Sequence, residues 1–297
     1  MVNLKKIKKK IIIGTAQLSS NYGISNFTNY KFDKKKIYKF LDFCLSNNFL
    51  NFDTANGYSS EKIIGEFIEK RKIKKKIYIT SKIPSLKKIS KKKKIKFINM
   101  CLLKTSKNLK QNLNTMLFHD QNDIPFILNN FDQIKKSFKN LNITNIGFSI
   151  YDFKYIEIIK KKIKKDKIII QVPINIINDE FLNKKYPKNF EIHGRSIFLQ
   201  GFLINRHIKN NIKKRYLNLH KKYFLYLEKN LINPFQLCFE IIKSPVHKKL
   251  IIGFDSIDQI KNLPMKKKES LNNLRKHIRE IKKIFKNTQI HDPRKWI

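Results

Sequence analysis

Cysteine, proline, glycine and acidic residues are all scarce in this chain of 297 residues. The three cysteines, Cys44, Cys101 and Cys238, are far apart and form no CxxC or Cys/His metal motif. Each lies in an apolar, helix-like context, so we expect buried, reduced thiols, which suit the cytoplasm. No metal site is expected.

Long apolar runs are also missing. No stretch of 18 apolar residues exists, so no membrane-spanning helix is expected. The run IIIG (11–14) after the basic start is too short for the core of a signal peptide. Neither a Pro/Gly/Ser-rich linker nor a solenoid-length repeat divides the chain. We therefore expect one soluble, cytoplasmic domain over 1–297, with its core at about 11–263 and a C-terminal helix and tail at 264–297.

The shortage of acidic residues leaves a large positive charge. The chain has 65 Lys and Arg against 22 Asp and Glu, a net charge of +43. Such a charge first suggests a nucleic-acid or anionic-membrane partner. The lysines, however, are spread over the whole length, as in 5–10, 91–96 and 158–167, and alternate with Ile and Asn rather than Arg. Phosphate-binding surfaces usually use Arg as well. We interpret most of the charge as solvated surface and expect no specific nucleic-acid partner; a basic anion-binding protein stays the less favoured alternative.

Short β-branched or apolar runs alternate with longer amphipathic stretches. The apolar runs predict eight buried strands, at 10–15, 49–54, 76–82, 114–120, 143–150, 167–173, 190–197 and 249–254. Helical periodicity predicts helices at 33–46, 61–70, 95–109, 124–138, 153–163, 213–230, 233–244, 256–263 and 270–285. Eight βα units predict an α/β fold of the (β/α)₈ TIM-barrel type. The rival, a doubly wound nucleotide-binding sheet, requires G-x-G-x-x-G, and none of the 8 glycines lie two apart.

Chemistry in such barrels sits at the C-terminal ends of the strands. Asp53, Lys82 and His119 end the second, third and fourth predicted strands, and Tyr58 follows Asp53 in the next loop. Each alone has a structural explanation, such as a cap, a solvated lysine or a core histidine. Together they place an acid, an ammonium, an imidazole and a phenol at one barrel mouth.

This combination suits proton transfer to a carbonyl group. A tyrosine is a weak acid, with an unperturbed pKa of about 10. A nearby ammonium lowers that pKa, and a carboxylate keeps the ammonium charged and in place. A histidine can hydrogen-bond the carbonyl oxygen. The sequence has no G-x-S-x-G nucleophile motif, which disfavours a hydrolase.

The chain resembles the aldo-keto reductases from about residue 11 to 263. The segments that carry the resemblance are IIIGTAQLSSNYGISN (11–26), NFDTANGYSSEKIIG (51–65), ITSK (79–82), MLFHD (116–120), IGFSIYD (146–152), IQVPINIIND (170–179), RSIFLQGFL (195–203) and IIGFDSIDQI (251–260). The most specific part is D-T-A-x-x-Y, followed in order by Lys, His, Ser, Gln and G-x-x-S on later strands.

The resemblance implies a barrel that binds NADP(H), less often NAD(H), without a Rossmann motif. Tyr58 would be the general acid, tuned by Asp53 and Lys82, and His119 would orient the carbonyl. The resemblance also implies the residues that bind the cofactor. Gly14, Thr15 and Ala16 would contact its nicotinamide end, Ser149 and Gln171 would hold the carboxamide, and Arg195 and Ser196 would contact it from the end of predicted strand 7. Gly253, Phe254 and Ser256 would bind the phosphate, and Gln259 would lie on the adenine side.

The sequence departs from the family pattern at four points. Glu61 follows Tyr58 by three residues rather than four, a shortening able to shift Tyr58. Arg195 falls where many members have an aromatic ring that stacks on the nicotinamide, so it would either stack there or bind an anionic substrate. Asp255 lies where the 2′-phosphate usually binds, and its carboxylate favours NAD(H). Leu263 replaces an expected Asn on the adenine side.

These features predict NAD(P)H-dependent reduction of an aldehyde or ketone, or the reverse oxidation. The first segment looks most like bacterial members associated with sugars, which hints at a sugar-like substrate. The alternative is a cofactor-binding regulatory or redox-sensing barrel with little turnover. We expect a monomer or weak homo-oligomer. The tail, residues 288–297, is expected to trail in solvent rather than to bring His291 or Trp296 to the mouth.

Overall fold

Eight parallel strands close into a barrel in the order of the sequence, in a computed structural model that describes residues 4–18, 33–110, 113–209, 212–263, 271–290 and 292–296. The strands are β1 (Ile11–Gly14), β2 (Asn51–Asp53), β3 (Tyr78–Ile83), β4 (Leu113–Phe118), β5 (Asn145–Ser149), β6 (Ile168–Pro173), β7 (Phe190–Arg195) and β8 (Lys249–Gly253). All eight predicted strands and the (β/α)₈ fold are confirmed.

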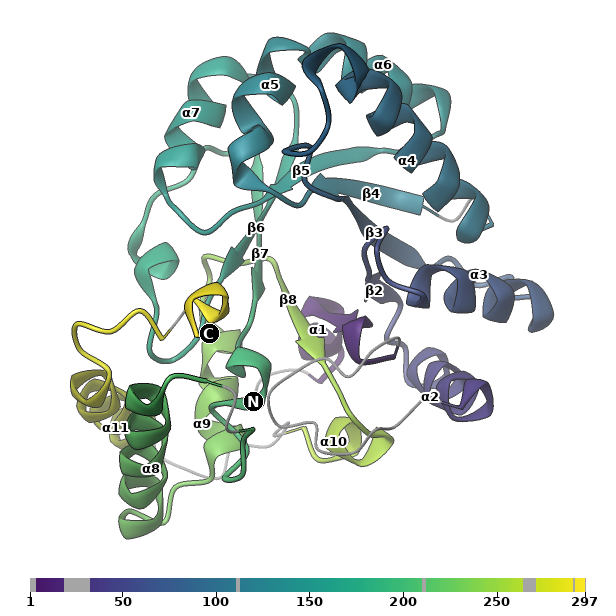
Figure 1. Ribbon diagram of the computed structural model, residues 1–297. Coiled ribbons are helices and arrows are strands. Elements are labelled where there is room, and N and C mark those ends of the chain that lie inside the picture. Colours follow the sequence, from purple (N-terminus) through teal and green to yellow (C-terminus); the bar gives the residue numbers. More distant parts are fainter. Residues whose placement is uncertain are drawn as a thin grey trace.

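Helices surround the strands (Figure 1). They are α1 (Leu4–Lys10), α2 (Lys34–Ser46), α3 (Ser60–Lys70), α4 (Lys94–Asn108), α5 (Ile124–Asn129), α6 (Phe131–Asn140), α7 (Lys154–Lys162), α8 (Lys214–Lys229), α9 (Pro234–Phe239), α10 (Ile257–Lys261) and α11 (Leu271–Ile284). None of the helices in these ranges is both long and apolar enough to cross a membrane.

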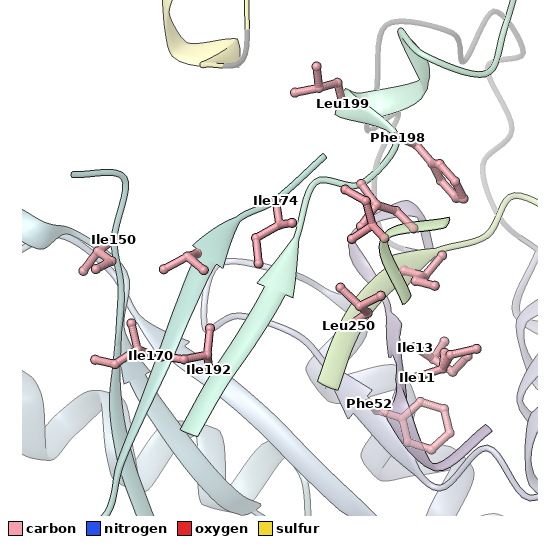
Figure 2. Close-up of a cluster of buried hydrophobic side chains, with 14 of the residues drawn as sticks. Ile11, Ile13, Phe52, Ile150, Ile170, Ile174, Ile192, Phe198, Leu199 and Leu250 are labelled. Carbon is pink, nitrogen blue, oxygen red and sulfur yellow. The ribbon is translucent and has the colours of Figure 1, made fainter. Parts of the chain in front are cut away.

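Alternation along each strand separates the core from the site. Ile13, Phe52, Ile170, Ile192 and Leu250 belong to a buried apolar cluster of this core (Figure 2). Their neighbours in sequence point to the other side of the sheet, because successive side chains of a strand face opposite ways. The barrel interior therefore takes the polar residues, and it carries them to the C-terminal mouth.

Two helical predictions differ from the structure. The predicted helix 124–138 is divided into α5 and α6 at Asn130, whose backbone leaves the helical region at φ −121° and whose side-chain amide donates to Phe126 O (2.7 Å). The basic run 5–10 lies in α1, where no helix was predicted. Ile7 of α1 is buried, and Lys10 Nζ donates to Ile242 O (3.2 Å).

The expectation that the tail trails in solvent is wrong for Trp296. Its side chain is 2% exposed, packs against Phe202 with ring centroids 5.6 Å apart, and donates from Nε1 to Ile290 O (2.7 Å). The backbone N–H of Lys213 donates to Trp296 O (2.9 Å), which fixes the tail to the start of α8. The indole is large and apolar, so burial against Phe202 stabilises it while its N–H keeps a hydrogen-bond partner. His291 lies outside the described residues.

Candidate active site

A buried ion pair occupies the mouth of the barrel. Lys82 Nζ lies 2.5 Å from Asp53 Oδ1, and the two side chains are 5% and 9% exposed. Lys82 also donates to Thr54 O (2.8 Å), and Gln171 Nε2 donates to the second carboxylate oxygen of Asp53 (2.9 Å). Strands β2, β3 and β6 thus supply one hydrogen-bonded group, in which each buried charge has partners. Thr15 Oγ1 donates to Asp53 O (2.9 Å) and ties the end of β1 to it.

Tyr58 lies in the turn between β2 and α3, at the wall of the same cavity. Its backbone N–H donates to Ala55 O (2.8 Å), and the N–H of Asn56 donates to Lys82 O (3.1 Å), so the turn is anchored to β3. The phenol is half-buried. The short spacing to Glu61 therefore leaves Tyr58 at the mouth with Asp53 and Lys82.

Glu61 explains how the shortened turn is held. Its carboxyl group is fully buried and accepts hydrogen bonds from Ser81 Oγ (2.5 Å), Thr105 Oγ1 (3.1 Å) and Asn108 Nδ2 (3.2 Å). These donors come from β3 and α4, so Glu61 fastens the first turn of α3 to both. In the sequence, Glu61 indicated only the length of the loop after Tyr58.

His119 stands on the cavity surface just after β4. Desolvation, with the positive charges of Lys82 and Arg195, lowers the pKa of His119 to about 4. His119 is exposed, so contact with solvent reduces the effect of desolvation, but Lys82 and Arg195 both lower the pKa as well. The imidazole is therefore neutral at pH 7 and able to donate one hydrogen bond to a carbonyl oxygen.

The cavity brings most of the predicted site residues together. Those that line it are Gly14, Thr15, Ala16, Asp53, Tyr58, Lys82, His119, Gln171, Arg195, Ser196, Gly253, Asp255 and Gln259. Gly14 and Gly253 are paired in register on β1 and β8, and a Cβ on Gly14 would come within 3.2 Å of Ile251. Neither glycine brings a side chain of its own into the cavity, but the Gln17 amide lies within 2.0 Å of where a Cβ on Gly253 would be. A nicotinamide placed at this end of the cavity would therefore lie against backbone and the Gln17 amide.

Three predicted cofactor residues lie elsewhere. Ser149 and Phe254 are buried, at 2% and 1% exposure, and do not contribute to the cavity lining. Ser256 caps α10, where its Oγ accepts from the backbone N–H of Gln259 (3.2 Å). The Gln259 side chain accepts from the N–H of Asp255 (2.8 Å), so these residues brace the rim beside β8.

Tyr151, the partner of Arg195, was not among the predicted site residues. The Arg195 guanidinium lies over the ring of Tyr151, with Cζ 4.2 Å from the centroid, and Tyr151 lines the cavity. Tyr151 follows predicted strand 5 directly, a signal that was available. Wall residues such as Gln200 and Pro293 carried no such signal, because the loop after β7 and the tail have no periodic pattern.

His193 lies deeper in the barrel, beneath Arg195 on β7. Its Nε2 is 2.9 Å from Glu191 Oε1, and its Nδ1 has no hydrogen-bond partner in the described part of the chain. Burial lowers the pKa of His193, partly offset by Glu191. The carboxylate as acceptor assigns the proton to Nε2. His193 therefore links the site to the polar base of the barrel and does not reach the cavity.

The metal-binding residue types do not gather in threes within the described ranges. The three cysteines are buried, as expected, and burial raises the pKa of Cys44 to about 12. Thiolate chemistry is therefore disfavoured at all three positions.

Comparison with known proteins agrees with this geometry. The model of the aldo/keto reductase family matches residues 10–284. No curated protein matches the sequence. An aldo-keto reductase from Bacillus halodurans in its holo form is 18% identical, with a TM-score of 0.69 over 95% of each chain. A glycerol dehydrogenase from Gluconobacter oxydans is 12% identical, with a TM-score of 0.63 over 92% of this chain and 90% of its own. These structures share the fold.

Proposed function

The chain belongs to the aldo/keto reductase family, and on that premise we propose that it reduces an aldehyde or ketone with NAD(P)H. Tyr58 is the proton donor, Asp53 and Lys82 hold the charge beside it, and His119 orients the carbonyl oxygen. The observation that supports this proposal is the buried Asp53–Lys82 pair, which shares one cavity with a half-buried phenol and a neutral imidazole.

Each residue has a task that follows from its contacts. When bound, the nicotinamide supplies the hydride for the carbonyl carbon. Tyr58 gives its proton to the oxygen that becomes negative, and the ammonium of Lys82 stabilises the phenolate that remains. Asp53 accepts from both Lys82 and Gln171, so the ammonium stays in one position. Because His119 is neutral, it donates a hydrogen bond to the carbonyl oxygen, and Tyr58 remains the group that transfers the proton.

Gly14, Gly253 and Gln171 would hold the nicotinamide end of the cofactor. Gly14 and Gly253 bring backbone without side chains of their own to the cavity wall, and the Gln171 amide keeps its orientation through Asp53. We propose NADP(H) as the cofactor, with NAD(H) as the alternative that the Asp255 carboxylate favours. One of the similar structures is a glycerol dehydrogenase, and polyol or sugar-type substrates are proposed here too.

The test is a titration with NADPH and NADH, followed by turnover with a panel of aldehydes and sugars. Tyr58→Phe should lower kcat by about 100-fold or more and leave cofactor affinity unchanged, because only the transferable proton is lost. Tyr78→Phe is the matched control, since Tyr78 begins β3, at the end of the strand far from Lys82 and the cavity. Absence of turnover with every compound, or full activity of Tyr58→Phe, would refute the proposal.

A further inference from the structure

Arg195 presents an unused charge to the cavity. It ends β7, where Nη2 donates to Ile150 O and Nη1 to Ser196 Oγ, both at 3.3 Å. Both bonds are long and both acceptors are neutral. A guanidinium carries five N–H donors, so most of its hydrogen-bonding edge stays available.

Cavity carboxylates do not neutralise Arg195. Asp53 is bound by Lys82 and Gln171, and Asp255 is held by Gln259 beside β8. No carboxylate within the described ranges forms an ion pair with Arg195, whereas Arg71 pairs with Asp42. The cation is thus free to pair with a charge brought by a ligand.

The guanidinium is also held in place before any ligand binds. Tyr151 covers one of its faces at 4.2 Å, and the bond to Ile150 O fixes it to the end of β5. Only seven of the 65 basic residues are Arg, so a planar fork at this position is distinctive in a chain that otherwise uses Lys. A fork matches the two oxygens of a carboxylate or phosphate, which a point charge does not.

We propose that the substrate carries a carboxylate or phosphate besides its carbonyl group, and that Arg195 binds this anion. The inference rests on the proposed function. His119, Tyr58 and Arg195 line one cavity, so a single ligand can place its carbonyl at the first two and its anion at the third. Arg195 is then a specificity-determining residue, and the Tyr151 ring positions it.

The test uses pairs of aldehydes that differ in the anion. Succinic semialdehyde against butanal examines the carboxylate, and glyceraldehyde 3-phosphate against glyceraldehyde examines the phosphate. The measured quantity is the ratio of kcat/KM within a pair. We expect the anionic member to be favoured by about 10- to 100-fold in at least one pair, the range of a charge-assisted hydrogen bond. The favoured pair identifies the anion, and added salt should reduce its ratio.

Arg195→Gln should bring that ratio to near one, and Arg195→Lys should restore part of it. Arg71→Gln, which removes a surface guanidinium, is the control and should leave the ratio unchanged. A wild-type ratio near one in both pairs, or an equal loss for both members in Arg195→Gln, would overturn the inference while the proposed function stands. Failure to reduce any of the four aldehydes would count against the proposed function itself and remove the inference with it.

Discussion

Replacing Glu61 with Ala should destabilise the protein strongly, because three hydrogen-bond donors then lose one acceptor group. Ser81, Thr105 and Asn108 donate to this carboxyl group, which is fully buried. A buried donor left unsatisfied costs about 1–3 kcal/mol. Even at the lower end, the free energy of unfolding should fall by about 3 kcal/mol, with a further contribution from the space left behind.

Glu61→Gln separates the hydrogen bonds from the volume. Its carbonyl oxygen still accepts from Ser81 and Thr105, but its amide turns an N–H toward the amide of Asn108. About one hydrogen bond is lost, so the cost should be about 1 kcal/mol.

Urea unfolding followed by circular dichroism measures both variants. Glu66→Ala is the control on the same helix, since Glu66 forms an exposed ion pair with Lys34, and it should cost less than about 1 kcal/mol. Activity should fall along with stability in Glu61→Ala. The N–H of Glu61 donates to Tyr58 O (3.4 Å), so a displaced first turn of α3 also displaces Tyr58. A Glu61→Ala protein within 1 kcal/mol of wild type would refute this account of how the Tyr58 turn is held.

Three further predictions concern pH, cofactor choice and the tail. Burial lowers the pKa of His220 to about 4, so between pH 6.5 and 4 the unfolded chain binds more protons than the folded protein, and the free energy of unfolding should decline as the pH falls through that window. His220→Gln should remove up to about 3 kcal/mol of this decline when unfolding is measured at each pH. An unchanged dependence of stability on pH in the variant would contradict this prediction. Asp255→Ser should shift the ratio of dissociation constants toward NADPH by about fivefold or more, since a like charge near the 2′-phosphate is removed; a constant ratio in fluorescence titrations would count against this position. Trp296→Ala should raise the KM for aldehydes, because Pro293 of the same tail lines the cavity, and a KM equal to that of wild type would show that the tail has no part in binding.

The strands could be predicted because most of them lie in short apolar or β-branched runs between polar segments, although β7 also carries Glu191, His193 and Arg195. The barrel followed from their number and spacing. The mouth residues Asp53, Lys82 and His119 followed in turn, because a parallel barrel brings all C-terminal strand ends to one face. The sequence suggested that the Asp53 carboxylate holds the Lys82 ammonium, but the hydrogen bond from Gln171 to the second oxygen of Asp53 depends on side-chain distances that no spacing states.

What could not be predicted depends on individual side-chain contacts, some local and some between distant segments. The break at Asn130 rests on a local side-chain bond that competes with an otherwise regular helical pattern. Trp296 carries no periodic signal, and its burial requires Phe202, nearly a hundred residues earlier. Glu61 appeared as a spacing irregularity, whereas its three donors come from β3 and α4.

Trp296 is the one tryptophan of the chain, and it is buried against the residue that follows cavity-lining Gly201. Its emission therefore reports on a single region of the molecule. The light that this indole emits overlaps the absorption of a reduced nicotinamide, which accepts energy when it is nearby, so quenching would follow cofactor binding without any added label. A shift of the emission to longer wavelength would instead mark the moment when the tail leaves the cavity wall.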